Sequence, residues 1–261
     1  MRLGFAVLAL IGFGCGQAAA DSVPLPRPRP VLLAEPRSFA EANPGLFDTG
    51  ELTAEPSDCR KRLDLIAAES PMPRLIGPGA CGGSDMVELD AILLADKTRV
   101  AIRPSPVLRC AMAEQLASWV REDAAPRLAQ LGAAVRSLEN FDDFECRGRN
   151  RVIGARLSEH GKGNALDVRA FTLADGRAIV PTDMSVAKDL RDDLRESACR
   201  RFTTVLGPGS DGHHEAHIHL DLAERTHGYR ICEWDVREPP PAIPLPQPRP
   251  AELAELDAQK L

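Results

Sequence analysis

Two segments indicate the fold of this chain: Ser158-Glu159-His160-Gly161-Lys162-Gly163-Asn164-Ala165-Leu166-Asp167 and His213-His214-Glu215-Ala216-His217-Ile218-His219-Leu220-Asp221. Together they contain five of the six histidines, and only His227 lies outside them. Imidazole and carboxylate groups are the usual ligands of a catalytic zinc ion that keeps one position open for water. Because histidine is rare in the rest of the chain, this clustering predicts a metal site.

Both segments alternate between residue types as β-strands do. Over residues 164–171, Asp167 shares one face with Ala165 and Arg169, and apolar residues occupy the other. Over residues 217–222, His217, His219 and Asp221 alternate with three apolar residues. We therefore predict two strands, each with an apolar face in the core and a polar face away from it.

The other patterns predict three helices and one further strand. We expect helices over residues 57–68, over 105–120, and from Asp183 or Ser185 to Arg201, a strand over 135–138, and a strand or loop over 152–157. In the second helix an apolar stripe predicts core packing: Leu108, Met112, Leu116, Trp119 and Val120. Because strands and helices do not alternate as regular βαβ units, we predict an α+β domain with a mainly antiparallel sheet and flanking helices.

Turn residues explain how the two segments supply ligands to one site. Gly161 and Gly163 permit a tight turn that folds His160 back beside Asp167, and His217 and His219 lie side by side on their strand. Three protein ligands plus water make an open zinc site. The alternative is a set of surface histidines with local hydrogen bonds, and the clustering favours metal. A nucleophilic Ser158 paired with His160 is disfavoured because no G-x-S-x-G elbow surrounds the serine.

The first twenty residues resemble a cleaved export signal. Arg2 precedes an apolar stretch from Leu3 to Gly14, and the small residues Ala18 to Ala20 precede Asp21. The apolar stretch is too short to span a membrane. A lipoprotein anchored at Cys15 is disfavoured, because Gly12 and Phe13 depart from a lipobox. We therefore expect a protein exported to the periplasm that does not span the membrane.

The cysteines predict a disulfide framework. After removal of the signal, six remain: Cys59, Cys81, Cys110, Cys146, Cys199 and Cys232. An even number in an oxidising compartment predicts three disulfides, and none of the spacings is that of a zinc finger. From local proximity we expect the pairs Cys59–Cys81, Cys110–Cys146 and Cys199–Cys232. The alternative is a set of scattered buried thiols.

Composition limits the function and the domain organisation. The formal net charge is −6 and there is no basic stripe, which argues against binding to nucleic acid. Pro-rich segments at residues 21–56 and 237–261 predict disordered flanks around a single folded domain at residues 57–236, after a signal peptide at residues 1–20.

Three longer motifs carry a family resemblance. Ser-x-His-x-x-Gly-x-Ala-x-Asp at Ser158 to Asp167, followed by His-x-His at His217 to His219, resembles the zinc D-alanyl-D-alanine peptidase and hedgehog superfamily. The stretches Cys146 to Asn150 and Cys199 to Gly209 more closely resemble the bacterial extensin-like C-terminal domain family. The resemblance covers about Cys59 to Cys232, and it implies a hedgehog-like, disulfide-stapled fold.

The resemblance also implies a function and a role for each site residue. It implies zinc ligands at His160, Asp167 and His219, a catalytic role for His217, and an Arg147 that faces the substrate carbonyl. It gives Ser158 a supporting role, and His214 and Glu215 are further candidate proton carriers. The implied activity is a monomeric zinc peptidase that hydrolyses peptide bonds of peptidoglycan stems or crosslinks, as an endopeptidase or a carboxypeptidase.

One departure from the family pattern supports an alternative function. Relatives often carry an aspartate where this chain has Ala216, and the neighbouring Glu215 would point to the opposite face of a strand. A lost carboxylate near a metal site typically changes affinity or rate by about 10- to 100-fold. The alternatives are therefore a zinc-stabilised, catalytically weak cell-wall binding module, and a structural domain held by disulfides without metal.

Overall fold

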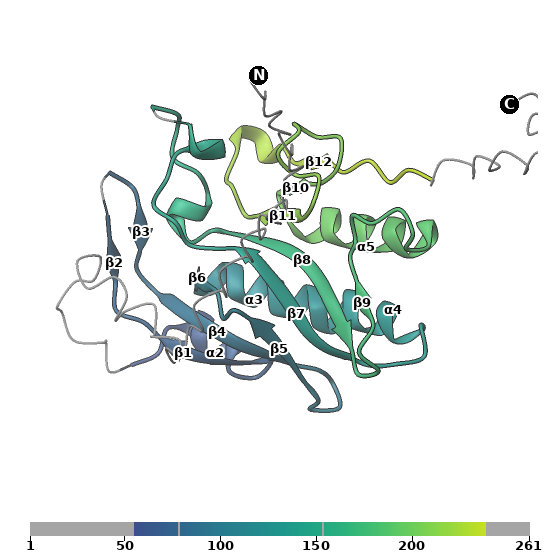
Figure 1. The fold of residues 1–261 in the computed structure, drawn as a ribbon. Helices are drawn as coiled ribbons and strands as arrows, with labels where there is room; N and C mark the ends of the chain where they lie inside the picture. The colour runs from purple at the N-terminus through teal and green to yellow at the C-terminus, as the bar shows by residue number, and fades with distance from the viewer. Residues whose placement is uncertain (1–54, 78, 153, 239–261) are drawn as a thin grey trace, which may run out of the picture. The chain divides into compact units, whose positions relative to one another are not determined.

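The computed structural model describes residues 55–238, apart from residues 78 and 153, and all of these residues fall in one compact unit (Figure 1). The expected signal peptide, nearly all of the N-terminal Pro-rich segment and the tail beyond residue 238 lie outside the described residues. None of the helices in this described part of the chain has the length and apolar character needed to cross a membrane.

A sheet of ten strands forms the centre of the domain. Its strands are β1 (Ala67–Pro71), β4 (Met86–Leu93), β5 (Arg99–Arg103), β6 (Val107–Arg109), β7 (Val135–Asp142), β8 (Ala165–Leu173), β9 (Ala178–Ile179), β10 (Thr204–Leu206), β11 (Ile218–Asp221) and β12 (Ile231–Glu233). The spatial order is β1, β4, β5, β7, β8, β11, β10, β12, with β6 beside β4 and β9 beside β8. Only the pairs β5–β7 and β10–β12 among these neighbours are parallel. A separate hairpin joins β2 (Leu75–Ile76) to β3 (Gly82–Gly83). The prediction of an α+β domain with a mainly antiparallel sheet is confirmed.

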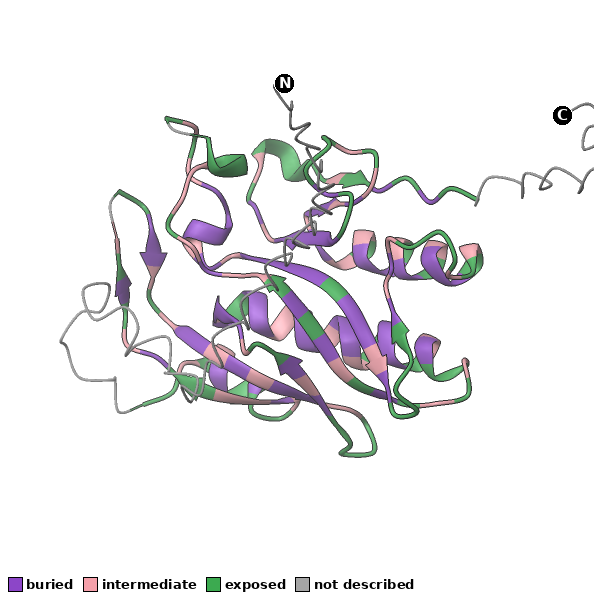
Figure 2. Cartoon of the chain, viewed as in Figure 1, coloured by how far each residue is buried: buried purple, intermediate pink, exposed green. Residues whose placement is uncertain are grey.

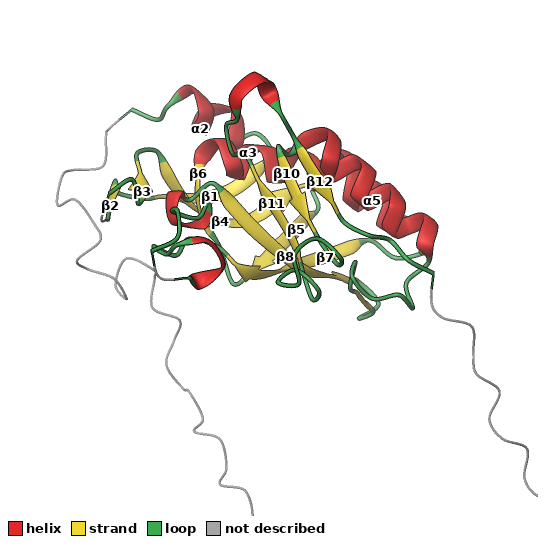
Figure 3. Cartoon of the chain, turned by 90° about the horizontal axis from the view of Figure 1, so that it is seen from above, coloured by secondary structure: helices red, strands yellow, loops and turns green. Residues whose placement is uncertain are grey.

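Helices cover one side of this sheet (Figure 3). They are α2 (Asp58–Leu63), α3 (Cys110–Trp119), α4 (Ala125–Ala129) and α5 (Lys188–Arg201), and a π-helical stretch at Val120–Ala124 joins α3 to α4. The Trp119 ring packs edge-on against Phe171 of β8, with centroids 6.0 Å apart, and against Phe202 at 5.9 Å. Its indole N–H donates to the hydroxyl of Ser197 at 3.0 Å, so its polar atom is satisfied in the core. Figure 2 shows the buried residues lying along both layers.

The two strands predicted from alternation are confirmed, and they are neighbours at the centre of the sheet. Leu166 and Val168 of β8, with Ile218 and Leu220 of β11, point into the apolar core between sheet and helices. The antiparallel register places His219 directly opposite Asp167. Because side chains alternate across a strand, the polar residues of both strands share the face that the helices leave uncovered. The strand predicted at 135–138 is also present and continues as β7 to Asp142.

The helix predicted over residues 57–68 ends at Leu63, so the prediction for its second half is wrong. Ser57 caps α2 as expected, because its hydroxyl accepts from the backbone N–H of Arg60 at 3.1 Å. From Ala67 onward the chain instead forms β1 along the edge of β4, with Ala67 paired to Ile92. Backbone hydrogen bonds to that edge outweigh the helix propensity of this alanine-rich stretch.

The other two helix predictions begin too early. Residues 107–109 pair with β4 as β6, and α3 begins only at Cys110; the Ser105 hydroxyl donates to Asp90 and caps no helix. The apolar stripe of that helix is buried, as predicted. Helix α5 begins at Lys188, because the Asp183 carboxylate accepts from the backbone N–H of Ser185 and closes a turn instead. The described residues of the segment predicted as a strand or loop, 152 and 154–157, form no strand beyond an isolated bridge between Leu157 and Gly148.

The described residues contain three disulfides, so the predicted number and the pair Cys199–Cys232 are confirmed. The other two expected pairs are wrong: Cys59 is bonded to Cys110, and Cys81 to Cys146. Cys59 lies on α2, which packs on the first turn of α3, and that contact brings it to Cys110 rather than to the next cysteine in the chain. Three disulfides are typical of an extracellular or periplasmic protein.

A buried arginine anchors the end of the described chain. Arg191 of α5 is only 2% exposed. Its Nε donates to the carbonyl of Val186 at 2.8 Å, and its Nη2 donates to the carbonyl of Arg237 at 2.7 Å. No carboxylate within the described ranges pairs with it. Arg191 therefore fixes the loop before α5 and the segment after β12, in which Trp234 and Val236 are also buried.

Candidate metal centre

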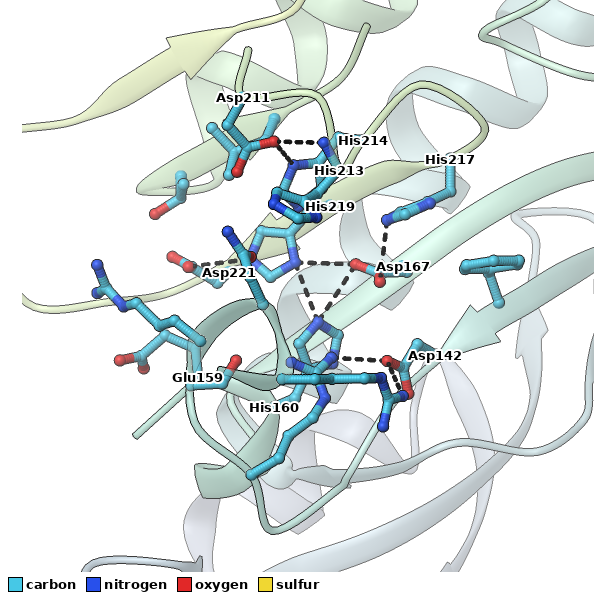
Figure 4. A pocket seen from close by; sticks show the side chains of 18 of the residues that line it. Asp142, Glu159, His160, Asp167, Asp211, His213, His214, His217, His219 and Asp221 are labelled. Atoms are coloured by element: carbon cyan, nitrogen blue, oxygen red, sulfur yellow. Dashed lines mark hydrogen bonds and ion pairs between the residues drawn. The ribbon is translucent and has the colours of Figure 1, made fainter. Parts of the chain in front are cut away.

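A cavity of about 570 Å³ lies over the polar face of β8 and β11 (Figure 4). Its wall is built from the end of β7, the loop at residues 147–160, β10, the loop at residues 211–217 and the segment around Arg225. Five histidines line it: His160, His213, His214, His217 and His219. The two histidine-rich segments therefore meet in one place, although strands far apart in the sequence carry them.

Three of the predicted ligands converge at the floor of this cavity. The Nδ1 of His219 lies 2.8 Å from Oδ1 of Asp167, and the Nε2 of His160 lies 3.3 Å from the same oxygen. The two ring nitrogens are 3.1 Å apart. All three residues are buried, and one ligand atom from each lies within 4.8 Å of the others. Two imidazole nitrogens and a carboxylate oxygen facing one point form a suitable ligand set for zinc.

Local backbone geometry places His160 at this point. His160 begins a short 3₁₀ turn, His160–Lys162, that ends at Gly163 with φ +64°. Glycine adopts this left-handed conformation without steric penalty, and it turns the chain directly into β8. A Cβ on Gly161 would lie 2.7 Å from the tip of the Leu157 side chain, which can move aside, so the left-handed φ of Gly163 is the stricter requirement. The predicted role of the glycines as turn residues agrees with this geometry.

Hydrogen bonds on the far side of each imidazole orient the ligand atoms. The Nδ1 of His160 donates to the backbone carbonyl of Asp143 at 2.8 Å, so Nε2 is the ring nitrogen that faces Asp167. The Nε2 of His219 lies 3.1 Å from Oδ2 of Asp221, so this ring presents Nδ1 to the same point. Such outer partners fix the tautomer and orientation of metal-bound histidines. The cluster is therefore arranged to hold a cation.

The shifted pKa values of Asp167 and His219 also show that the cluster favours a positive charge. Burial opposes charge on Asp167, yet hydrogen bonds from His160, His217 and His219 keep its pKa well below the usual range. Burial also opposes charge on His219, yet the carboxylates of Asp167 and Asp221 raise its pKa to about 10. Without a metal, a proton supplies the positive charge that these buried carboxylates require. A metal ion must displace that proton in order to bind.

Two further histidines stand beside the triad. The Nε2 of His217 lies 3.2 Å from Oδ2 of Asp167, and its ring stacks on Phe141 with centroids 4.6 Å apart. His214 holds Asp211 through Nδ1 at 2.6 Å, and its ring centroid is 5.2 Å from that of His217. Burial lowers the pKa of His214 despite the nearby Asp211 carboxylate. Both rings therefore lie in the cavity wall beside the triad.

Of the remaining predicted site residues, Arg147 and Ser158 line the cavity and Glu215 does not. Arg147 lines the cavity, but its guanidinium is paired with Asp142 at 2.7 Å and Glu145 at 2.9 Å. Ser158 lines the cavity and is buried. Glu215 does not line it, because its exposed carboxylate accepts from the backbone N–H of Gly209 at 3.0 Å. The structure thus brings every predicted site residue except Glu215 to one cavity.

Sequence reasoning did not assign roles to several residues of this wall. Asp221 could have been identified, since it continues the alternation of His217 and His219. Glu159 is buried and accepts from Lys162 at 2.6 Å and Asn164 at 2.7 Å. Asp211 and Arg225 also line the cavity, but they lie in loops where no periodic pattern marks them.

A second group of possible ligand residues is not a metal site. Cys59, Asp85 and Cys110 also lie within ligand distance of one another. The two cysteines are joined as a disulfide, so neither offers a thiolate. Among the described residues, the triad at the floor of the cavity is the group that retains its ligand atoms.

We expect Asp221→Asn to weaken zinc binding by about 10-fold or more, because the neutral amide orients the His219 ring less strongly. Competition with a chromophoric chelator measures this affinity. Asp142→Asn is a matched control, since Asp142 lines the same cavity but pairs with arginines. An Asp221→Asn protein with wild-type zinc affinity would show that His219 is oriented without this carboxylate.

Comparison with known proteins finds one family. The family described as "Extensin-like protein C-terminus" matches residues 57–233. The match includes the whole triad, His214, His217 and all six disulfide-bonded cysteines. The search of curated proteins gives no match.

Proposed function

Because the chain belongs to the extensin-like C-terminal domain family, we propose that it is a zinc-dependent peptidase acting on peptidoglycan stems or crosslinks. The observation that carries the proposal is the convergence of Nε2 of His160, Oδ1 of Asp167 and Nδ1 of His219. The substrate class rests on the resemblance of the Ser158 to Asp167 and His217 to His219 motifs to the zinc D-alanyl-D-alanine peptidase and hedgehog superfamily.

The residues present fit a zinc ion. Each triad residue is buried, each offers one suitable atom, and both imidazoles are oriented from behind by Asp143 and Asp221. Zinc bound there supplies Lewis acidity and lowers the pKa of a bound water to about 7. The protein has to supply the proton carriers and the contacts that orient a substrate.

Two side chains can move the proton that amide hydrolysis requires. His217 donates to the Asp167 carboxylate through Nε2, so its Nδ1 is the atom that accepts a proton beside the ligand cluster. His214 stands next to it, and Asp211 fixes Nδ1 so that Nε2 of His214 remains available. The proton then passes from this pair to the leaving amine.

Arg147 and Ser158 face the substrate from the opposite wall. Arg147 uses Nε and Nη2 for its two carboxylate partners, and its Nη1 has no hydrogen-bond partner among the described residues. The Nη1 donors are therefore available to a carbonyl oxygen that gains negative charge. The buried hydroxyl of Ser158 supports the same side of the cavity.

A second candidate function is a zinc-stabilised cell-wall binding module with weak or no turnover. Two observations favour it. Ala216 replaces an aspartate that relatives often carry, and the charge of Arg147 is already compensated by Asp142 and Glu145. A third candidate, a metal-free structural domain, is separated from both by the zinc content of the purified protein.

The setting that we propose is the periplasm. The N-terminal export signal expected from the sequence would deliver the chain there, and the three disulfides suit an oxidising compartment. We propose that the mature protein acts there as a monomer and does not bind nucleic acid.

Mature zinc-loaded protein is expected to convert crosslinked muropeptides into monomers, or to shorten stem peptides, as measured by chromatography of the products. A chelator should stop the reaction. His217→Ala should retain zinc and lower the rate by about 10²- to 10⁴-fold, because it removes a proton carrier. Ala216→Asp should leave the rate equal or raise it.

The outcome that separates the candidates is a zinc-loaded protein that binds peptidoglycan and releases no product. That result would replace the peptidase with the binding module. Protein that contains no zinc after zinc supplementation would instead support the metal-free structural domain.

A further inference from the structure

One arginine of the cavity wall, Arg225, is held in place by neutral acceptors alone. Arg147 and Arg151 are both paired with Asp142 and Glu145. Arg225 instead donates to the backbone carbonyl of Thr203 at 3.2 Å and to the hydroxyl of Thr204 at 2.6 Å. Within the described part of the chain no carboxylate forms an ion pair with Arg225. The guanidinium is held by neutral acceptors, so no carboxylate of the described residues occupies its remaining N–H donors.

Among the described residues, the cavity wall contains a second arginine without an acidic partner, Arg149, but its side chain is not held in place as that of Arg225 is. Arg149 also lines the cavity, but its side chain is exposed and no hydrogen bond or ion pair from another described residue holds it. Arg225 is half-buried and fixed by two hydrogen bonds. A fixed cation loses less conformational entropy when it binds an anion, and partial burial strengthens the attraction.

Strand register places Arg225 next to the metal centre. In the antiparallel pair of β10 and β11, Leu206 lies opposite His219, and Thr204 lies opposite Asp221. Thr204 and Leu206 are two residues apart, so their side chains point to one face of β10. This is the face on which His219 and Asp221 lie in the neighbouring strand β11. Arg225 is bonded to Thr204, and therefore it stands one strand beyond the ligand cluster.

Apolar side chains complete this part of the wall. Leu206 and Ile231 both line the cavity and are both partly exposed. Ile231 of β12 is the partner of Thr204 in the parallel pair. A fixed cation beside two small apolar surfaces matches an amino-acid residue that carries a carboxylate and a small side chain.

We propose that Arg225, with Leu206 and Ile231, forms a subsite that binds a carboxylate of the substrate peptide. The proposal rests on the peptidase function above and specifies the chemistry of its substrate. Arg225 stands one strand beyond His219, and neighbouring strands of a sheet are about 4.8 Å apart. Consecutive Cα atoms of a bound peptide are about 3.8 Å apart. If a peptide bond of the substrate lies beside His219, the residue that follows this bond therefore reaches Arg225. That residue would present its C-terminal carboxylate, as in a carboxypeptidase substrate.

A stem peptide has two sources of such a carboxylate. One is its C-terminus, and the other is the side chain of an acidic residue. The chemistry of recognition is the same, a guanidinium donating two hydrogen bonds to a carboxylate. A peptide amide with no acidic side chain lacks both sources, and an amide with an acidic side chain keeps only the second.

Arg225 also contacts a residue that leads back to the metal centre. The Thr204 hydroxyl hydrogen-bonds the Asp221 carboxylate, and Asp221 orients His219. If Arg225 acted only by holding Thr204, its removal would weaken zinc binding and would affect acid and amide peptides alike. Zinc affinity therefore has to be measured together with peptide binding.

The test is calorimetric binding to zinc-loaded full-length His217→Ala protein, in which slow turnover does not consume the peptide. The first probe is an N-terminally blocked tripeptide that ends in D-Ala-D-Ala and has a free C-terminal carboxylate. The second is the same tripeptide with a C-terminal amide. The third is also a C-terminal amide, with an acidic residue in place of the last D-Ala. We expect the Kd of the acid to be roughly 10- to 100-fold lower than that of the first amide. Arg225→Gln should raise the Kd of the acid to that of the amide and should leave zinc affinity unchanged.

Arg230→Gln is the matched control, because Arg230 also donates to backbone carbonyls, those of Cys199 and Arg200, and does not line the cavity. It should keep the preference for the acid. If the acidic-side-chain amide binds as tightly as the free acid, the subsite takes a side-chain carboxylate.

Equal Kd values for the free acid and both amides would overturn the proposal. So would an Arg225→Gln protein that loses zinc or weakens all peptides equally. The peptidase function is tested by a different measurement. It fails if protein with an intact His217 releases no product. The preference for the free acid is measured as binding to the His217→Ala protein.

Discussion

Asp167→Asn is expected to lower the zinc content of the purified protein from one ion per chain to none and to abolish hydrolysis. The carboxylate lies within 3.3 Å of nitrogens from three imidazoles, His160, His217 and His219, so it is the centre of the cluster. An amide of the same shape provides no negative charge to hold a cation among buried groups. His219→Ala should have the same effect, because it removes a ligand atom.

Elemental analysis together with product chromatography measures both effects. His227→Ala is the matched control, since His227 is exposed and does not line the cavity. His217→Ala should keep its zinc. If His217→Ala lost zinc and His219→Ala kept it, the ligand assignment of the two histidines would be reversed.

Arg191→Ala is expected to lower the free energy of unfolding by roughly 3–5 kcal/mol. Two effects add. The removed side chain leaves a cavity beneath α5, and the carbonyls of Val186 and Arg237 lose their donor in a buried setting. The segment that contains Trp234 and Val236 then loses one of its attachments to the core.

Urea unfolding followed by circular dichroism measures this change. Arg195→Ala on the same helix is the matched control, because its side chain is partly exposed and pairs only with Asp192. Surface changes of that kind usually shift the free energy of unfolding by less than about 0.5 kcal/mol. Equal shifts for the two variants would show that the buried hydrogen bonds of Arg191 do not anchor the segment.

The parts of the site that lie on strands were predictable from the sequence. Asp167, His219 and Asp221 share one face because side-chain direction alternates with a period of two, which is a property of the backbone itself. Their apolar neighbours had to point into the core. The same reasoning located β8, β11 and most of α3, where the burial pattern is long and regular.

The parts that depend on non-local partners were not predictable. Residues 67–71 and 107–109 have acceptable helix propensity, but both lie beside β4 and take its free hydrogen bonds. The pairing of Cys59 with Cys110 follows from the packing of α2 on α3, which no spacing encodes. Asp211 and Arg225 belong to loops, and only the folded chain brings them to the cavity.

The register that places His219 opposite Asp167 also has a consequence for folding. These residues are 52 positions apart in the chain, and His160 and His219 are 59 apart. Closing such long loops is entropically unfavourable, so we expect β8 and β11 to pair late during folding. The complete ligand set does not exist until that pairing is made. An ion bound at the proposed site would therefore slow the separation of β8 from β11 without speeding their pairing.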